Sequence, residues 1–298
     1  MNFRSKYIHT KDGAQLTIWD NGYEGIPVVF VHGFPETHVS WNAVIDQLSN
    51  EIIQEYRIIL YDLRGFGESS RTGEASLTQF YYDHQTIVSD LNLDKYHLVG
   101  HDWGGAIALH VARFNPEQLL SLSVMNTNYW KTDIMGMWHM LFFNFPILPS
   151  AVFKMIPDKF FEFSMVGSFV NKTGLTPETR KAYLQMFRDK ETTQYWTKLY
   201  RNMGKLLLRQ KLPMLKKFYS PSRLKLPEPS PTAFQTNVKL IWGTEDRFNP
   251  LWICHEIEEQ LKKRGANVSV NTISNSGHFV QEEQPVKVAT CLLEHWKK

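Results

Sequence analysis

Gly100-His101-Asp102-Trp103-Gly104-Gly105 joins an apolar run, Tyr96–Gly100, to a segment with helical spacing, Gly105–Asn115. This stretch has the form of a nucleophile elbow, in which small residues on both sides of a central side chain permit a sharp, strained turn from a strand into a helix. The central residue is Asp102. The motif alone also fits a glycine-rich turn in which Asp102 is only a helix N-cap, so the choice depends on the rest of the chain.

Short apolar runs rich in Val, Ile and Leu recur along the sequence and predict β-strands. They are uninterrupted rather than alternating, which is typical of a parallel sheet covered on both faces. Segments with helical spacing separate most of them, and this alternation predicts a doubly wound α/β domain. The expected strands are Ile26–Val31, Arg57–Tyr61, Tyr96–Gly100, Leu119–Met125, Val238–Trp242 and Val268–Ile273. The expected helices are Val39–Leu48, Thr78–Leu91, Gly105–Asn115, Trp252–Lys263 and Val286–Lys297.

The alternation of strand and helix breaks between residues 131 and 225. This stretch holds helix-like segments and no convincing strand, and a proline-rich connector, Leu226–Pro231, follows it. We therefore expect residues 1–130 and 226–298 to form an α/β core domain, with residues 131–225 inserted as a helical cap.

Further motifs stand where the other predicted strands end. His32-Gly33-Phe34-Pro35 follows the first of them, Asp246 ends the run Val238–Trp242, and His278 follows the last one. A single histidine is usually a surface or core residue. However, the order nucleophile, acid, histidine along the chain is the order of the α/β-hydrolase triad, which makes an incidental role for Asp102 and His278 a poor explanation.

Three stretches carry a family resemblance: HGFPE at His32–Glu36, YDLRGFGES at Tyr61–Ser69, and GHDWGG at Gly100–Gly105. With the order of the motifs, they make the sequence resemble the α/β-hydrolase fold, and within it the epoxide hydrolases and the haloalkane and haloacetate dehalogenases. The resemblance implies a mostly parallel, doubly wound sheet with an inserted helical cap, no metal and no organic cofactor.

An aspartate nucleophile restricts the chemistry. A carboxylate, with a reference pKa of about 3.9, is ionised at neutral pH and needs no base to activate it. It can attack an sp³ carbon to form an ester, whereas attack on an ester or amide would give a labile anhydride. His278 is then the expected base for hydrolysis of the Asp102 ester, and Asp246 orients the imidazole. The backbone N–H groups of Phe34 and Trp103 are the expected oxyanion hole.

The leaving group separates an epoxide hydrolase from a dehalogenase, because an opening epoxide needs a proton donor. Epoxide hydrolases carry two such donors on the cap, usually tyrosines, and Tyr200 in Tyr200-Arg201-Asn202-Met203 resembles the second of these. At the first position this sequence has His139, and a His/Tyr pair is similar to Cif-like bacterial epoxide hydrolases. Each residue could instead be packed in an apolar helix, and Tyr195 is the nearest rival of Tyr200.

Two tryptophans and a proline are expected around the substrate. Trp103, Trp138 and Pro35 are candidate pocket walls, although a pocket wall and a core residue look alike in sequence. Some haloacetate dehalogenases also place a histidine where His139 stands. Trp103 occupies the position of their arginine, and Phe34 the position where haloalkane dehalogenases favour asparagine.

The sequence therefore predicts an epoxide hydrolase that forms a vicinal diol through an Asp102 ester. The alternative is a haloalkane or haloacetate dehalogenase with the same nucleophile. A non-catalytic binding protein with a hydrolase fold is less consistent with the intact set Asp102, Asp246 and His278.

The composition excludes several classes of protein and of partner. The 298 residues carry a net charge of +3 and only two cysteines, Cys254 and Cys291, without metal-ligand spacing. This argues against a disulfide scaffold, a cysteine-based zinc site and a nucleic-acid partner. No apolar stretch has the length of a signal peptide or a membrane-spanning helix. We expect a cytoplasmic protein, although an exported protein without its signal would look the same, and the oligomeric state is open.

The small net charge is the sum of two opposite ones. Residues 131–225 hold 17 Lys and Arg against 6 Asp and Glu, and the remaining residues are net acidic. A solvated cap exterior explains this distribution. The alternative is that a basic cap steers anionic epoxides to the site.

Overall fold

The computed structural model describes residues 3–48, 54–129, 142–211, 224, 226–230 and 236–297. Within them, eight strands form one sheet in the order β1-β2-β4-β3-β5-β6-β7-β8. The strands from β4 to β8 in this order run parallel, whereas β2 pairs antiparallel with both β1 and β4. The strands are β1 (Arg4–His9), β2 (Gln15–Asp20), β3 (Ile26–Val31), β4 (Tyr56–Tyr61), β5 (Tyr96–His101), β6 (Leu119–Met125), β7 (Asn237–Gly243) and β8 (Asn267–Ile273).

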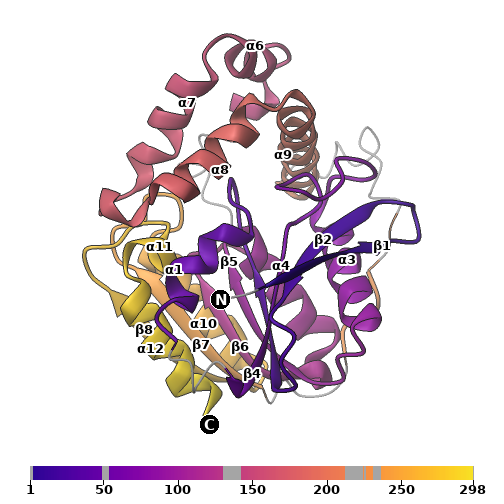
Figure 1. The fold of residues 1–298 in the computed structure, drawn as a ribbon, viewed down its shortest axis with the longest axis vertical. Helices are drawn as coiled ribbons and strands as arrows, with labels where there is room; N and C mark the ends of the chain where they lie inside the picture. Colours follow the sequence, from indigo (N-terminus) through magenta and orange to yellow (C-terminus); the bar gives the residue numbers. More distant parts are fainter. Residues whose placement is uncertain are drawn as a thin grey trace.

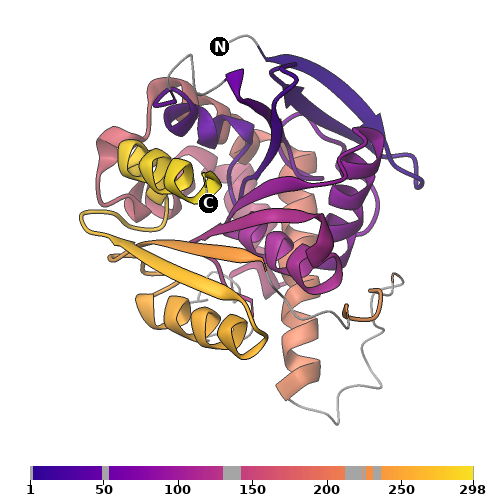
Figure 2. The same ribbon diagram turned by 90° about the horizontal axis from the view of Figure 1, so that it is seen from below.

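Helices cover both faces of the sheet (Figure 2). Helices α1 (Asn42–Ile45) and α12 (Pro285–Trp296) pack on one face, and α3 (Leu77–Asp90), α4 (Trp103–Phe114) and α10 (Leu251–Lys263) pack on the other. Successive side chains of β3 alternate between the two cores, since Val28 and Phe30 lie in one and Val29 and Val31 in the other. Both faces are therefore apolar, which explains the uninterrupted apolar runs of the sequence.

A helical layer separates β6 from β7 in the chain and lies beyond one end of the sheet (Figure 1). Its buried aromatic side chains, among them Phe153, Phe161, Phe187 and Trp196, belong to the same apolar cluster as the core under α3 and α4. The layer consists of α6 (Leu148–Met155), α7 (Pro157–Ser164), the short 3₁₀ helices η3 (Val166–Ser168) and η4 (Lys172–Gly174), α8 (Pro177–Arg188) and α9 (Lys190–Lys211).

The structure confirms the doubly wound α/β fold and all six expected strands. The expected domain boundaries at residues 131 and 225 fall outside the described residues and stay predictions. The helix expected over Val39–Leu48 is shorter: a 3₁₀ helix, η1 (His38–Trp41), capped by Thr37, leads into α1.

Strands β1 and β2 were not predicted from the sequence. In β1 only Ile8 is buried, so this edge strand has no apolar run.

The tightest backbone contact at the elbow yields a stability prediction. A Cβ atom at Gly104 would lie 2.0 Å from the carbonyl oxygen of Val31, whereas one at Gly167 would have only an ordinary contact of 3.6 Å. We expect Gly104→Ala to lower the free energy of unfolding by about 1–3 kcal/mol, because the strand backbone must move. Gly167→Ala is the matched control and should be close to neutral. Urea denaturation measures both, and equal midpoints would contradict the prediction.

Candidate active site

Asp102 occupies a strained turn between β5 and α4. Its backbone has a φ of 49° and a ψ of −115°, a conformation that residues with a Cβ atom adopt only at a cost. A Cβ atom at Gly100 would lie 2.3 Å from the carbonyl oxygen of Gly104. A Cβ atom at Gly104 would overlap the carbonyl oxygen of Val31, as described above. Side chains are therefore excluded on both sides of Asp102, as the Gly-x-Asp-x-Gly motif predicts.

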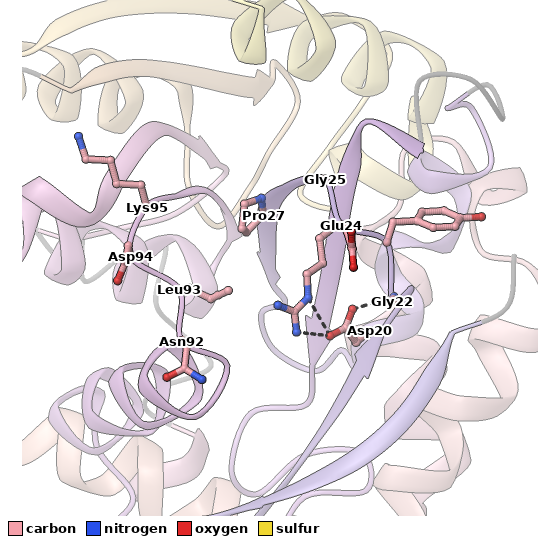
Figure 3. A pocket seen from close by; sticks show the side chains of 11 residues that line it. Asp20, Gly22, Glu24, Gly25, Pro27, Asn92, Leu93, Asp94 and Lys95 are labelled. Atoms are coloured by element: carbon pink, nitrogen blue, oxygen red, sulfur yellow. Dashed lines mark hydrogen bonds and ion pairs between the residues drawn. The ribbon is translucent and has the colours of Figure 1, made fainter.

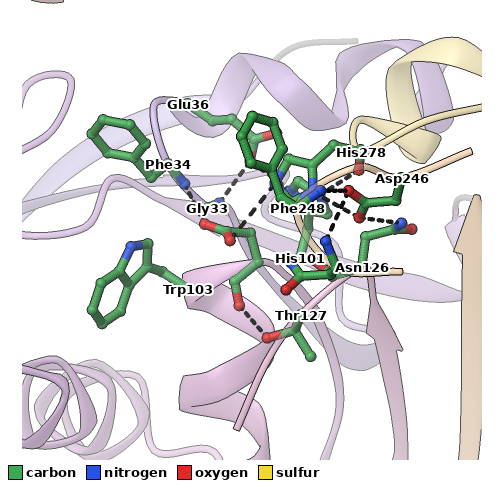
Figure 4. Close-up of polar contacts among 12 residues, drawn as sticks. Gly33, Phe34, Glu36, His101, Trp103, Asn126, Thr127, Asp246, Phe248 and His278 are labelled. Carbon is green, nitrogen blue, oxygen red and sulfur yellow. Dashed lines mark hydrogen bonds and ion pairs between the residues drawn. The ribbon is translucent and has the colours of Figure 1, made fainter. Parts of the chain in front are cut away.

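Two backbone N–H groups hold the Asp102 carboxyl group. The N–H of Phe34 donates to Asp102 Oδ1 at 2.8 Å, and the N–H of Trp103 also hydrogen-bonds to the carboxyl group. The loop after β3 can come this close because position 33 is glycine: a Cβ atom at Gly33 would lie 2.4 Å from that of Asp102. The structure thus brings the predicted nucleophile and the predicted oxyanion pair together (Figure 4).

His278 links the two carboxylates of the site. Its Nδ1 lies 2.9 Å from Asp246 Oδ2, and its Nε2 lies 3.7 Å from Asp102 Oδ2. The three residues follow β5, β7 and β8, strands whose carboxyl ends meet at one edge of the parallel sheet. The Asp102 side chain is 21% exposed, whereas those of His278 and Asp246 are 5% and 0% exposed, so Asp102 is the most accessible of the three.

Asp246 is held by donors that were not predicted from the sequence. Asn126 Nδ2 donates to its Oδ2 at 2.7 Å, and the backbone N–H groups of Phe248 and Asn249 donate to its Oδ1 at 2.8 and 3.0 Å. Asn126 follows β6 with a φ of 37°. An asparagine directly after an apolar strand was the available signal.

Burial and neighbouring charges shift the pKa values of the site residues in opposite directions. Burial raises the pKa of Asp102, against the effects of His278, His101 and the two N–H donors. Burial would also raise the pKa of Asp246, but the positive charge of His278 and the donated hydrogen bonds hold it below its ordinary value. Burial lowers the pKa of His278, but the negative charges of Asp246 and Asp102 outweigh this and raise it to about 9. At neutral pH His278 is therefore an imidazolium, placed between the carboxyl groups of Asp102 and Asp246.

A second buried histidine supports the same loops. His101 Nδ1 lies 3.0 Å from Glu36 Oε2, and its Nε2 lies 2.8 Å from the carbonyl oxygen of His278. Glu36 Oε2 also accepts a hydrogen bond from the N–H of Gly33 at 2.6 Å. Since a carbonyl oxygen only accepts, Nε2 of His101 must donate, and the ring fixes the backbone at His278. Both residues lie inside the motifs quoted from the sequence, but neither was assigned a role there.

Tyr200 on α9 lies above the elbow. Its hydroxyl group is 3.3 Å from Nε1 of Trp103, and its ring stacks on Phe143 at 4.4 Å and meets Phe34 edge-on at 5.0 Å. Burial, reinforced by the charge of Asp102, raises the pKa of Tyr200 well above its ordinary value. The phenol therefore stays protonated and can serve as a donor.

The rival tyrosine points elsewhere. The hydroxyl group of Tyr195 donates to the carbonyl oxygen of Glu74 at 2.9 Å, and its ring packs so tightly on Gly65 that a Cβ atom there would lie 2.0 Å from it. Tyr195 is a buried link between α9 and the loop after β4.

The remaining predicted residues have different outcomes. Pro35 is buried and follows Phe34 through a cis peptide bond, and its place in a pocket wall stays a prediction. Trp103 is 5% exposed and faces Tyr200. His139 and Trp138 lie outside the described residues.

A surface depression of about 410 Å³ lies at the opposite edge of the sheet (Figure 3). Its lining comes from Asp20 at the end of β2, Arg57 of β4, and the segments that lead into β3 and β5, which include Asn92. Asp20 and Arg57 bind each other, with Arg57 Nη2 donating to Asp20 Oδ2 at 2.7 Å. The depression is therefore remote from Asp102, and its charged pair is internally satisfied.

Among the described residues, His, Cys, Asp and Glu side chains form no group of three or more suited to a metal ion. No helix in the same part of the chain has the length and apolar character needed to cross a membrane. The arrangement around Asp102 combines groups suited to nucleophilic substitution: a carboxyl group that can attack, N–H groups that can hold an oxyanion, and an oriented histidine that can activate water.

Comparison with known proteins finds relatives named as epoxide hydrolases and a dehalogenase. Mouse epoxide hydrolase 4 (Mus musculus) is 28% identical over 299 residues, which cover 94% of this chain and 76% of that protein. A fluoroacetate dehalogenase from Burkholderia sp. is 30% identical over 184 residues, covering 56% of this chain and 59% of the relative. An epoxide hydrolase from Bacillus megaterium, solved as a mutant in complex with its diol product, superimposes with a TM-score of 0.78 at 22% identity, covering 98% of this chain and 100% of that one.

A family model described as the alpha/beta hydrolase fold matches residues 26–285. The match extends from β3 to the first residue of α12 and so includes every strand that carries a residue of the site. The chain therefore belongs to the α/β hydrolase fold family.

Proposed function

We propose that this protein is an epoxide hydrolase that converts epoxides to vicinal diols through an ester of Asp102. The observation that carries the proposal is an aspartate, rather than a serine, on the strained turn, with Oδ1 bound by the N–H of Phe34 at 2.8 Å and Oδ2 facing Nε2 of His278 at 3.7 Å. Relatives named as epoxide hydrolases, such as the mouse protein, support it.

In the first step, Asp102 Oδ2 attacks an epoxide carbon. A carbon–oxygen ester bond forms as the ring carbon–oxygen bond breaks, and the departing oxygen takes the proton of the Tyr200 hydroxyl group. Tyr200 suits this role because its ring is clamped by Phe143 and Phe34 and its high pKa keeps the proton in place until an alkoxide develops.

In the second step, His278 takes a proton from water, and the resulting hydroxide attacks the carbonyl carbon of the Asp102 ester. Phe34 and Trp103 donate to the oxyanion of the tetrahedral intermediate. The bond between the acyl carbon and the alkyl oxygen then breaks, and this oxygen takes the proton of the newly formed Asp102 carboxyl group, which gives the diol and the Asp102 carboxylate. Esterification removes the negative charge of Asp102, one of the charges that raise the pKa of His278 to about 9. The first step thus lowers the pKa of His278. The imidazolium then gives its proton to the Tyr200 phenolate left by ring opening, and the neutral imidazole can act as a base.

We propose that the helical layer α6–α9 is the cap of this enzyme. It brings Tyr200 over Trp103 and Phe34 from a part of the chain remote from the sheet. The proton donor for the first step would then belong to the cap, and the nucleophile and base to the core.

Dehalogenation is the second candidate. Trp103 Nε1 donates toward the Tyr200 hydroxyl group at 3.3 Å, so two donors converge where a halide could depart. The fluoroacetate dehalogenase among the relatives is consistent with this alternative. We favour the epoxide because a phenol can transfer a proton to an alkoxide, a step that a halide does not need.

Assays of the purified protein with epoxides, haloacids and haloalkanes separate these functions. We expect diol from epoxides and no free halide, with Asp102→Ala as the inactive control. Halide release without diol would contradict the proposed epoxide hydrolase and show that the protein is a dehalogenase. Absence of both products across the panel would favour a non-catalytic binding protein.

Replacing the base should trap the ester. In His278→Gln we expect hydrolysis of the ester to slow by about 10²–10⁴-fold, the usual contribution of a general base. Intact-mass spectrometry should then find Asp102 carrying the added mass of the epoxide. His255→Gln, at a histidine that is 59% exposed on α10, is the matched control and should turn over normally. An inactive His278→Gln protein without adduct would contradict the mechanism.

Removing the phenolic proton should impair ring opening. We expect Tyr200→Phe to reduce the rate of adduct formation by at least about 100-fold, since general acids contribute about 10²–10⁴-fold. Tyr195→Phe changes the same atom on the same helix but removes only the hydrogen bond to Glu74, so its rate should be retained. Rapid-quench mass spectrometry compares them, and unchanged formation in Tyr200→Phe would exclude Tyr200 as the donor.

A further inference from the structure

A segment of the helical layer rests directly on the loop that carries His278. Phe169, between η3 and η4, stacks on Phe279 with the ring centroids 4.6 Å apart and the planes at 15°. A Cβ atom at Gly277 would lie 3.0 Å from the carbonyl oxygen of Ser168. The residues on either side of His278 are therefore in contact with this segment, which descends beside α11 (Val280–Glu283) (Figure 1).

One carboxylate joins the two sides of this contact. Glu283 Oε1 accepts a hydrogen bond from the N–H of Gly277 at 2.9 Å. Glu283 Oε2 accepts two from the helical layer, from the N–H groups of Val170 at 2.9 Å and Asn171 at 2.8 Å. The residue is 3% exposed, so these bonds form away from bulk water, where hydrogen bonds to a charged acceptor are strong.

Neither step of the proposed reaction uses Glu283. The His278 ring is already oriented by Asp246, and its carbonyl oxygen by His101. The bond from Gly277 to Glu283 adds a restraint on the residue before His278. Through Glu283, this restraint also reaches Val170 in the helical layer.

We propose that Glu283 is a positioning residue that couples the seating of the helical layer to the placement of His278. The inference rests on the proposed function for the role of His278 as the base. When residues 168–171 are seated, Glu283 bridges them to Gly277 and holds the imidazole at its working distance from Asp102. When they withdraw, the bridge opens and the base loses this restraint.

The two half-reactions separate this role from a purely structural one. Ester formation uses Asp102 and Tyr200, whereas ester hydrolysis also needs His278. Glu283→Gln keeps the volume of the side chain but leaves one acceptor oxygen for donors on two sides, and its NH₂ group faces an N–H group. A displacement of about 1 Å can cost up to about 100-fold in rate. We expect hydrolysis to slow by between about tenfold and 100-fold, with ester formation within about twofold of wild type.

The matched control breaks a different link between the layer and the core. Lys198 on α9 donates to the carbonyl oxygen of Gly73 at 2.7 Å, so Lys198→Met removes a layer-to-core bond that does not reach the His278 loop. It should leave both rates unchanged. Phe169→Leu weakens the contact between residues 168–171 and the His278 loop, as Glu283→Gln does, but it alters no charge. It should slow hydrolysis in the same way.

Single-turnover rapid quench with intact-mass detection measures both rates on any substrate that alkylates Asp102. If only haloacids do so, the proposed function fails and the same two rates test the coupling on that substrate. NMR titration of the His278 ring in the substrate-free protein is a second measurement. We expect its pKa of about 9 to fall in Glu283→Gln and Phe169→Leu and to hold in Lys198→Met.

Equal slowing of both half-reactions in Glu283→Gln would overturn the coupling, because it would indicate general damage to the site. An unchanged His278 pKa in both Glu283→Gln and Phe169→Leu would overturn the coupling as well. The second result stands even if no substrate is found, so it is distinct from failure of the proposed function.

Discussion

The strained backbone at Asp102 is the constraint on which the site depends. A non-glycine residue in such a conformation costs about 1–3 kcal/mol, and it persists only where its surroundings hold it. The N–H of Asp102 donates to the carbonyl oxygen of Met125 at 3.2 Å, and its own carbonyl oxygen accepts from the N–H of Ala106 at 3.0 Å and from Thr127 Oγ1 at 2.6 Å. The turn is thus fastened to β6 and to α4, so its strain is offset by the central part of the fold.

The close approaches around the turn follow from the same constraint. A Cβ atom would overlap a neighbouring group at each of three glycines: Gly33, Gly100 and Gly104. Their absence of side chains lets the loop after β3 bring the N–H of Phe34 to Asp102. The proposed nucleophile and its two N–H donors are therefore preorganised before substrate arrives, and preorganised donors give the most effective electrostatic stabilisation.

Much of this could be predicted from the sequence, because the decisive signals are local. Asp102, Phe34, Asp246 and His278 each follow a parallel strand, and the carboxyl ends of such strands meet at one edge of the sheet. The hairpin of β1 and β2 was missed because β1 buries only Ile8 and carries no apolar run.

What could not be predicted depends on tertiary packing. Tyr195 and Tyr200 lie on one helix, and both are buried. The contact of Tyr195 with Gly65 and that of Tyr200 with Trp103 separate them, and neither contact has a sequence pattern. The bridge at Glu283 joins residues more than 100 positions apart, so the Glu282-Glu283 pair reads in sequence as an ordinary acidic helix start.

In the proposed mechanism, the proton donor lies on the helical layer and the base on the core, so the two must be in place at the same time. A layer that moves to admit substrate carries Tyr200 away from Asp102, so ring opening is confined to the seated state. Without a link, His278 would be equally active in both states, and the ester could meet water before the layer had settled. With the joint at Phe169 and Glu283 resting on the His278 loop, the seated state that favours the donor also favours the base. Nucleophile, donor and base then reach their working geometry together, although they come from strands and helices far apart in the chain.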